Sequence, residues 1–171
     1  MNGVSEYKNV ILYLLRFVGL YLLAVWIYNY FLSFYKNTID PLTALTARLV
    51  YDTYRLLHIP AEVIPAQNEG IKLLIHQKYI ARIVEGCNAV SIIILFAAFV
   101  LSFWKLNKKT LIFLLAGIMS IFLFNILRIT LLGYILYAFP AYQDFWHRIV
   151  FPGLIYSWIV FLWVLFINKF L

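Results

Sequence analysis

The sequence predicts an all-α integral membrane protein that forms one polytopic domain over residues 1–171. Hydrophobic residues make up 65% of the sequence and charged residues 12%, whereas soluble domains are about half apolar and a quarter charged. The mean hydropathy is +0.90. About four transmembrane helices are expected, because apolar runs cover residues 10–35, 88–104, 110–139 and 152–169. An interfacial amphipathic helix and a small extracytoplasmic β-like segment are expected between the first two.

The apolar composition indicates a lipid bilayer as the partner, and the net charge of +7 does not indicate nucleic-acid binding. Lys105, Lys108 and Lys109 cluster between two apolar runs, where the positive-inside rule predicts them. The protein has one cysteine, Cys87, which excludes an intramolecular disulfide. Its thiol is therefore either an inert packing group or a reactive one. The residues suggest no metal site and no cofactor, and they do not specify an oligomeric state.

The first apolar run, residues 10–35, is expected to remain in the protein as a membrane span. It is too long for the apolar region of a signal peptide and lacks a small-x-small cleavage site before its polar end. About 20 apolar residues suffice to cross the hydrocarbon core. Arg16 lies near one end, where its guanidinium can snorkel to the interface.

An amphipathic helix is predicted to start at Asp40-Pro41, which reads as an N-cap followed by proline at the first helical position. One stripe of this helix is apolar, and polar residues lie on a second stripe. The apolar stripe, called the leucine stripe below, consists of Leu42, Leu45, Leu49 and Leu56. This pattern favours a helix lying at the membrane interface, and a helix packed on neighbouring protein remains the alternative.

Residues 62–84 read as a small β-meander outside the bilayer. Turn-forming residues interrupt the segment, and residues 71–75 and 79–83 resemble short strands. The segment leads directly into Cys87, which we expect in the first turn of the second span. Pro140 should end the third span, and Pro152-Gly153 should precede the fourth.

We expect both termini on the cytoplasmic side. The lysine-rich turn of residues 105–109 supports this orientation, but the segment of residues 36–87 also carries lysines and arginines. Counting cations alone therefore does not decide the orientation. Long segments translocate largely regardless of their charge, so the turn is given more weight.

Three residues far apart in sequence are predicted to lie at one membrane level. Cys87 lies 17 residues before Trp104, and Arg128 lies 18 residues after Thr110. At 1.5 Å per residue, both are about 26 Å from the connecting turn, near the opposite edge of a ~30 Å hydrocarbon core. His147 falls shortly before the fourth span, on that same side.

A thiol, an arginine and a histidine at one level suit acyl transfer. A helix N-terminus and a cationic neighbour such as Arg128 lower the pKa of a thiol, and the thiolate is the nucleophile. Backbone N–H groups near Asn88 and Ala89 are expected to receive an oxyanion. His147 is the expected proton carrier between the thiol and the leaving amine.

Each residue also has a plainer interpretation. Cys87 can be a packing residue, since a lone cysteine in an apolar protein usually is. Arg128 can snorkel to the interface, although a charge within a span is a functional candidate by default. His147 can belong to an interfacial aromatic belt. The coincidence of all three at one depth favours a site. His58 and His76 are expected to be surface or interface residues.

At these positions the sequence resembles the exosortase/archaeosortase family of membrane cysteine transpeptidases, and most closely the small exosortase F type of the Bacteroidetes. The resemblance covers residues 85–153 and includes a cysteine that opens a span, the motif Asn125-x-x-Arg128-Ile129 and a histidine before the last span. It implies Cys87 as nucleophile, an essential Arg128 and His147 as the third member. Many members have Ser-Gly or Thr-Gly after the cysteine, whereas this protein has Asn88-Ala89.

The resemblance also implies substrates and location. Substrates would be membrane-tethered proteins whose C-terminal sorting signal has a short motif, a hydrophobic helix and a basic tail. The protein would lie in the bacterial inner membrane with its site facing outward, and Asn88, Ala89 and Asn125 would support the substrate or oxyanion. Two other classes remain open: a non-enzymatic membrane scaffold subunit, and a Cys/His acyltransferase acting on lipid.

Overall fold

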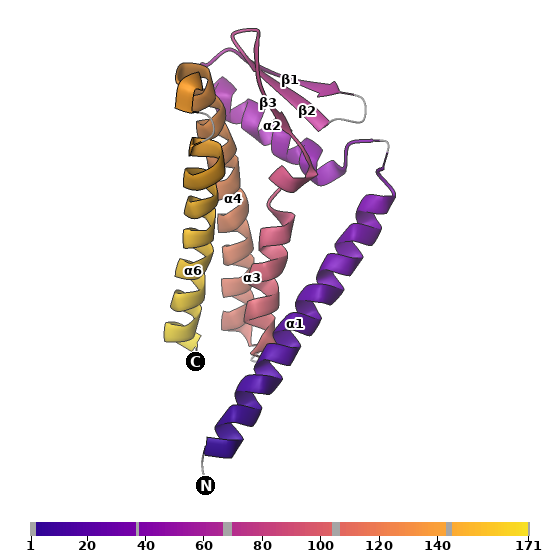
Figure 1. Ribbon diagram of the computed structural model, residues 1–171, viewed down its shortest axis with the longest axis vertical. Helices are drawn as coiled ribbons and strands as arrows, with labels where there is room; N and C mark the ends of the chain where they lie inside the picture. The colour runs from indigo at the N-terminus through magenta and orange to yellow at the C-terminus, as the bar shows by residue number, and fades with distance from the viewer. Residues whose placement is uncertain (1–2, 37, 67–69, 104–106, 143–144, 171) are drawn as a thin grey trace.

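The computed structural model describes residues 3–36, 38–66, 70–103, 107–142 and 145–170 (Figure 1). Its long helices are α1 (Gly3–Ser33), α4 (Lys108–Ala138) and α6 (Phe151–Phe170), with the shorter α3 (Val90–Ser102) beside α4. Helix α2 (Pro41–Leu56) and a small sheet cover one end of this bundle. Both termini lie toward the opposite end, as Figure 1 shows.

Among the described residues, three helices are long and apolar enough to cross a membrane: Tyr7–Ser33, Lys108–Ala138 and Trp146–Phe170. The expected count of four spans is therefore not confirmed. The run predicted at 88–104 is apolar and helical, but α3 has 13 residues, a rise of about 20 Å against a core of ~30 Å. It starts late because Ala89 has a φ of 61°, which is left-handed backbone and not helix.

The last span begins earlier than predicted. We expected it to start at Pro152, with His147 in the preceding loop, but the helical segment already includes Trp146–Val150 as a π-helical turn. The Phe151 N–H donates to the C=O of Trp146, five residues back. Proline cannot donate to a helical ladder and crowds the carbonyl four residues earlier, and a wider turn before Pro152 accommodates it.

Helix α2 begins where predicted but buries another face. The Asp40 carboxylate accepts hydrogen bonds from the N–H groups of Leu42 and Thr43 at 3.0 and 2.9 Å. The leucine stripe is not the buried face, since Leu45 and Leu56 are 45% and 77% exposed. The buried residues are small or shaped to fit: Thr43, Thr46, Ala47, Val50 and Tyr54. The helix thus packs on the protein with one face and leaves leucines exposed on another.

Tyr54 anchors α2 to α4. Its hydroxyl donates to the C=O of Thr130 at 2.5 Å, and burial raises the pKa of this hydroxyl. Gly133, one turn further along α4, leaves room for the ring, since an added Cβ would meet the Tyr54 hydroxyl and lie 2.9 Å from Leu73 Cδ2.

The predicted β-meander is present as a three-stranded antiparallel sheet in the order β1-β2-β3. Its strands are β1 (Ala61–Ala66), β2 (Gly70–Ile75) and β3 (Lys78–Ile83). The turn between β2 and β3 places His76 and Gln77 at φ values of 49° and 61°. The sheet buries Ile71, Leu73, Ile75 and Ile83 in one cluster with α2 and α4. The end of β3 thereby has a fixed position above α4.

Helix α1 leans across the bundle and contacts it mainly through α3 (Figure 1). Near its N-terminal half, Tyr13 packs on Phe99 and Phe103, and Phe17 packs on Phe99. Near the other end, the Tyr28 hydroxyl accepts a hydrogen bond from Asn88 at 2.8 Å. The most apolar stretch of α1 has no residue buried within the protein, so this stretch is exposed for contact with lipid.

The fit at Gly133 yields a stability prediction. We expect Gly133→Ala to destabilise the protein by about 1–3 kcal/mol, the usual cost of overpacking. Gly19→Ala is the matched control, because nothing lies within 4 Å of a Cβ added there and alanine is the better helix former. The midpoint temperature of aggregation in detergent, measured by size-exclusion chromatography after heating, compares the stability of the two variants. Equal midpoints for the two variants would contradict the proposed contact.

Candidate active site

Cys87 lies in a short turn between the sheet and α3. Val84 is extended, and a 3-10 turn then covers Glu85–Cys87, with the Cys87 N–H donating to the Val84 C=O at 2.7 Å. The Cys87 residue is half-buried. The prediction that Cys87 occupies the first turn of a span is wrong, because α3 begins only at Val90.

Asn88 ties this turn to three helices. Its amide oxygen accepts from the Val90 N–H at 3.1 Å. Its amide nitrogen donates to the Tyr28 hydroxyl at 2.8 Å and to Thr43 Oγ1 at 3.3 Å. The residue is 2% exposed, so its amide is a buried link between α1, α2 and α3. The backbone N–H of Asn88 donates to the Glu85 C=O at 3.4 Å.

Asn125 joins the Cys87 turn to Arg128. Its amide nitrogen donates to the backbone carbonyl oxygen of Cys87 at 2.7 Å, and its amide oxygen accepts from Arg128 Nη1 at 3.2 Å. Asn125 is fully buried. The structure therefore brings Cys87 and Arg128 together through one side chain, although the helical rise assumed from Cys87 onward applies only from Val90.

The guanidinium of Arg128 faces the protein. Its Nε atom is buried and has no hydrogen-bond partner within the described residues. The guanidinium interacts electrostatically with Cys87 and with Tyr156 of α6. A buried N–H donor without a partner is costly, and here it belongs to the arginine that Asn125 links to the Cys87 backbone. This arrangement differs from the snorkelling alternative.

His147 is placed apart from this pair. It is exposed in the π-helical turn, and within the described residues no hydrogen bond or ring contact joins it to Cys87 or Arg128. Tyr156 follows His147 by nine residues, which is about 14 Å along a helix. Tyr156 was not singled out from the sequence, although a hydroxyl within an apolar span is a signal that can be read there.

The remaining candidates lie outside the site. His58 and His76 are exposed, as expected, and the ring of His76 stacks on Tyr137 with centroids 5.3 Å apart. Among the described residues, no three His, Cys, Asp or Glu residues are grouped as metal ligands would be.

Comparison with known proteins identifies the family. The family model for the transmembrane exosortase (Exosortase_EpsH) matches residues 9–167. The chain belongs to the transmembrane exosortase family. The matched region contains the Cys87 turn, Asn125, Arg128 and His147. Searches of curated proteins and of solved structures find no match. Family membership indicates a multi-pass membrane protein of the protein-sorting protease or transpeptidase class.

The two hydrogen bonds of Asn125 can be separated by substitution. Asn125→Asp keeps an acceptor for Arg128 but loses the donor to the Cys87 C=O, so two oxygens face each other in a buried place. We expect substrate processing to slow about tenfold to hundredfold, since an unsatisfied buried group costs about 1–3 kcal/mol. Pulse–chase labelling of the substrate and the alkylation rate of Cys87 measure the change.

The control for this experiment is Ser120→Ala on the same helix, which also loses a side-chain hydrogen bond, but to α6 and not to the Cys87 turn: the Ser120 hydroxyl donates to the Gly117 C=O at 2.9 Å and accepts from Trp158 Nε1 at 3.3 Å. It should process substrate at the normal rate. Normal processing and normal thiol alkylation in Asn125→Asp would show that the Cys87 turn needs no anchor on α4.

Proposed function

We propose that this exosortase is a membrane cysteine peptidase or transpeptidase that cleaves C-terminal sorting signals of exported proteins through a thioacyl intermediate at Cys87. The observation that carries the proposal is the buried Asn125 amide, which holds both the Cys87 backbone and the Arg128 guanidinium. One amide thus links the backbone of the protein's one cysteine to an arginine guanidinium, and a cysteine thiolate is the nucleophile that forms a thioacyl intermediate. A cysteine that only fills space would need neither a hydrogen bond from Asn125 to its backbone nor a link from that amide to Arg128.

In the first step, the Cys87 sulfur attacks the scissile carbonyl and the C–N bond then breaks. The carbonyl oxygen develops negative charge, and preorganised donors stabilise it. Arg128 Nε supports this role as a buried donor that has no partner among the described residues. The backbone N–H of Ala89 remains the proposed second donor, whereas the Asn88 N–H already donates to the Glu85 C=O and the Asn88 side-chain amide holds this backbone in place.

The leaving amine needs a proton, and His147 is the proposed carrier. Family resemblance supports this role. Because His147 is exposed, the substrate would have to lie between the Cys87 turn and the π-helical turn. In this position its scissile bond could contact both Cys87 and His147. In the second step an amine or water attacks the thioacyl carbon and releases Cys87.

The proposal extends to the substrates and to the side of the membrane that the site faces, and family membership supports it. We propose membrane-tethered proteins whose C-terminal signal carries a short motif, a hydrophobic helix and a basic tail, processed at the outer face of the bacterial inner membrane by an enzyme of the exosortase F type. The arrangement in Figure 1 supports this, since the sheet and α2 lie at the end away from both termini.

The thiol provides the primary test. We expect Cys87→Ala and Cys87→Ser to insert and fold normally but to stop processing completely, because acyl transfer needs the thiolate. Full-length substrate should accumulate on immunoblots, and the variants should elute normally in size-exclusion chromatography. Processing at the normal rate in Cys87→Ala would end the cysteine-enzyme proposal.

The role of His147 is tested by the pH profile. If His147 carries the proton, His147→Ala should slow both formation and breakdown of the thioacyl intermediate by about 10²–10⁴-fold, and the bell-shaped pH dependence should lose one limb. His76→Ala, another exposed histidine, is the control and should behave as the wild type. Near-normal turnover of His147→Gln would remove His147 from the site.

A further inference from the structure

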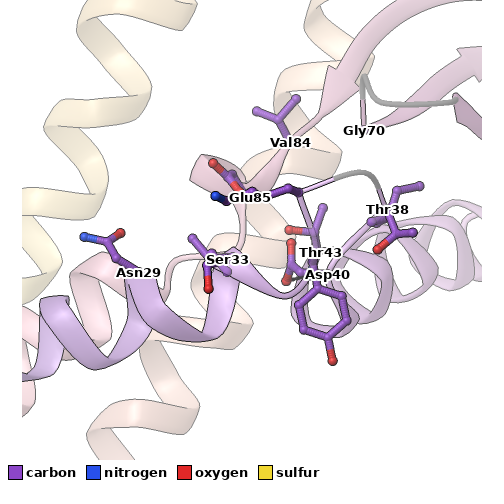
Figure 2. Close-up of a pocket in the computed structure, with 12 residues that line it drawn as sticks. Asn29, Ser33, Thr38, Asp40, Thr43, Gly70, Val84 and Glu85 are labelled. Carbon is purple, nitrogen blue, oxygen red and sulfur yellow. Dashed lines mark hydrogen bonds between the residues drawn. The ribbon is translucent and has the colours of Figure 1, made fainter.

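A cavity of about 570 Å³ lies between the end of α1, the start of α2 and the Cys87 turn. Its size is in the range of small-molecule sites, about 300–1,000 Å³. Figure 2 shows polar residues around it from all three elements. The polar lining residues include Asn29, Ser33, Thr38, Asp40, Thr43 and Glu85. Neither the catalytic steps above nor the contacts of Arg128 use this cavity.

The cavity adjoins the nucleophile through one short turn. Glu85 lines the cavity and begins the 3-10 turn that ends at Cys87, so the α-carbons of these two residues are at most about 7 Å apart. Thr43, on the opposite wall, accepts a hydrogen bond from Asn88 at 3.3 Å. A molecule bound in the cavity would therefore lie one short turn away from Cys87.

The walls carry more negative than positive charge. Glu85 is exposed toward the cavity and Asp40 is 4% exposed, and both act electrostatically on the Tyr28 hydroxyl. Lys36 is the one cation among the described lining residues. Two carboxylates and one ammonium give a formal charge of −1. Within the described residues, Lys36 forms no ion pair with either carboxylate.

One carboxylate is already engaged and the other is not. Asp40 Oδ1 accepts from two N–H groups at the start of α2, which satisfies that oxygen. The Glu85 carboxylate accepts no such hydrogen bond from the described residues, and it is the carboxylate nearer to Cys87 in sequence. The hydroxyl and amide groups of the cavity add hydrogen-bond acceptors beside it.

We propose that this cavity is the acceptor subsite, which binds a primary amine in its ammonium form beside the thioacyl intermediate. The inference rests on the proposed thioacyl function and deepens it. Glu85 binds the ammonium group by a charge-assisted hydrogen bond. Glu85 first takes one proton from the ammonium group, which frees the nitrogen lone pair to attack the thioacyl carbon. A C–N bond forms and the C–S bond breaks, and the second proton passes from the nitrogen to the departing Cys87 sulfur, which leaves as the thiol.

The test measures how the intermediate partitions between amine and water. Full-length enzyme in detergent is acylated with a dansyl-glycine benzyl thioester, and ethanolamine is added as the probe amine. Mass spectrometry detects acylated Cys87, and chromatography gives the ratio of dansyl-glycine amide to dansyl-glycine acid. Cys87→Ala supplies the uncatalysed background. Glu62→Gln is the matched control, because Glu62 is an exposed carboxylate on β1 that does not line this cavity.

With ethanolamine, we expect Glu85→Gln to lower the amide-to-acid ratio about fivefold or more, because the variant loses the charge-assisted hydrogen bond between the carboxylate and the ammonium group. The rate of Cys87 acylation should stay unchanged. With hydroxylamine, which is largely uncharged at neutral pH, the ratio should change less. An equal ratio in Glu85→Gln and Glu62→Gln would overturn the acceptor subsite. A slower acylation step in Glu85→Gln would also overturn it and assign the cavity to the donor. If wild-type Cys87 forms no acyl adduct, the proposed function fails first.

Discussion

The buried amide of Asn125 is the interaction on which the site depends. It spans 38 residues of sequence, from the Cys87 C=O to α4, and its other end holds Arg128. A fully buried amide must use its donors and acceptors, because an unpaired polar group in an apolar interior is costly. Here a backbone oxygen and a guanidinium satisfy it. The position of the nucleophile relative to the cation is thus set by one residue.

Helix α4 can hold this amide in place because other elements pack closely along it. Gly117 admits the ring of Phe96 from α3, and Gly133 admits Tyr54 from α2. Asn125 lies eight residues from each of these glycines. The α3 helix is therefore seated on one side of the amide, and α2 with the sheet on the other. The short loop between sheet and α3, which carries Cys87, has both of its ends attached to α4.

The sequence predicted what hydropathy and helical rise determine. Apolar runs located the helices, the Asp40-Pro41 pair located the start of α2, and a rise of 1.5 Å per residue placed Cys87 level with Arg128. Tertiary contacts decided the rest. The leucine stripe of α2 favoured a helix at the membrane interface, and it does not reveal the face that α2 buries, which consists of Tyr54 and smaller residues. The late start of α3, the π-helical turn before Pro152 and the approach of Tyr156 to Arg128 depend on backbone angles and packing that periodicity does not encode.

The pair after the nucleophile shows how this protein departs from the Ser-Gly and Thr-Gly pattern of many family members. Residue 89 is left-handed, with φ at 61°, and glycine adopts that conformation freely whereas alanine does so at a cost of about 1–2 kcal/mol. Ala89 is 4% exposed, and such strain persists only where neighbouring contacts enforce it. Asn88 supplies them: one end of its amide caps Val90, and the other binds Tyr28 and Thr43. A hydroxyl has one donor hydrogen where the amide nitrogen has two. The larger amide therefore stabilises a backbone that glycine would adopt unaided, and it links the Cys87 turn to Thr43 on the wall of the cavity.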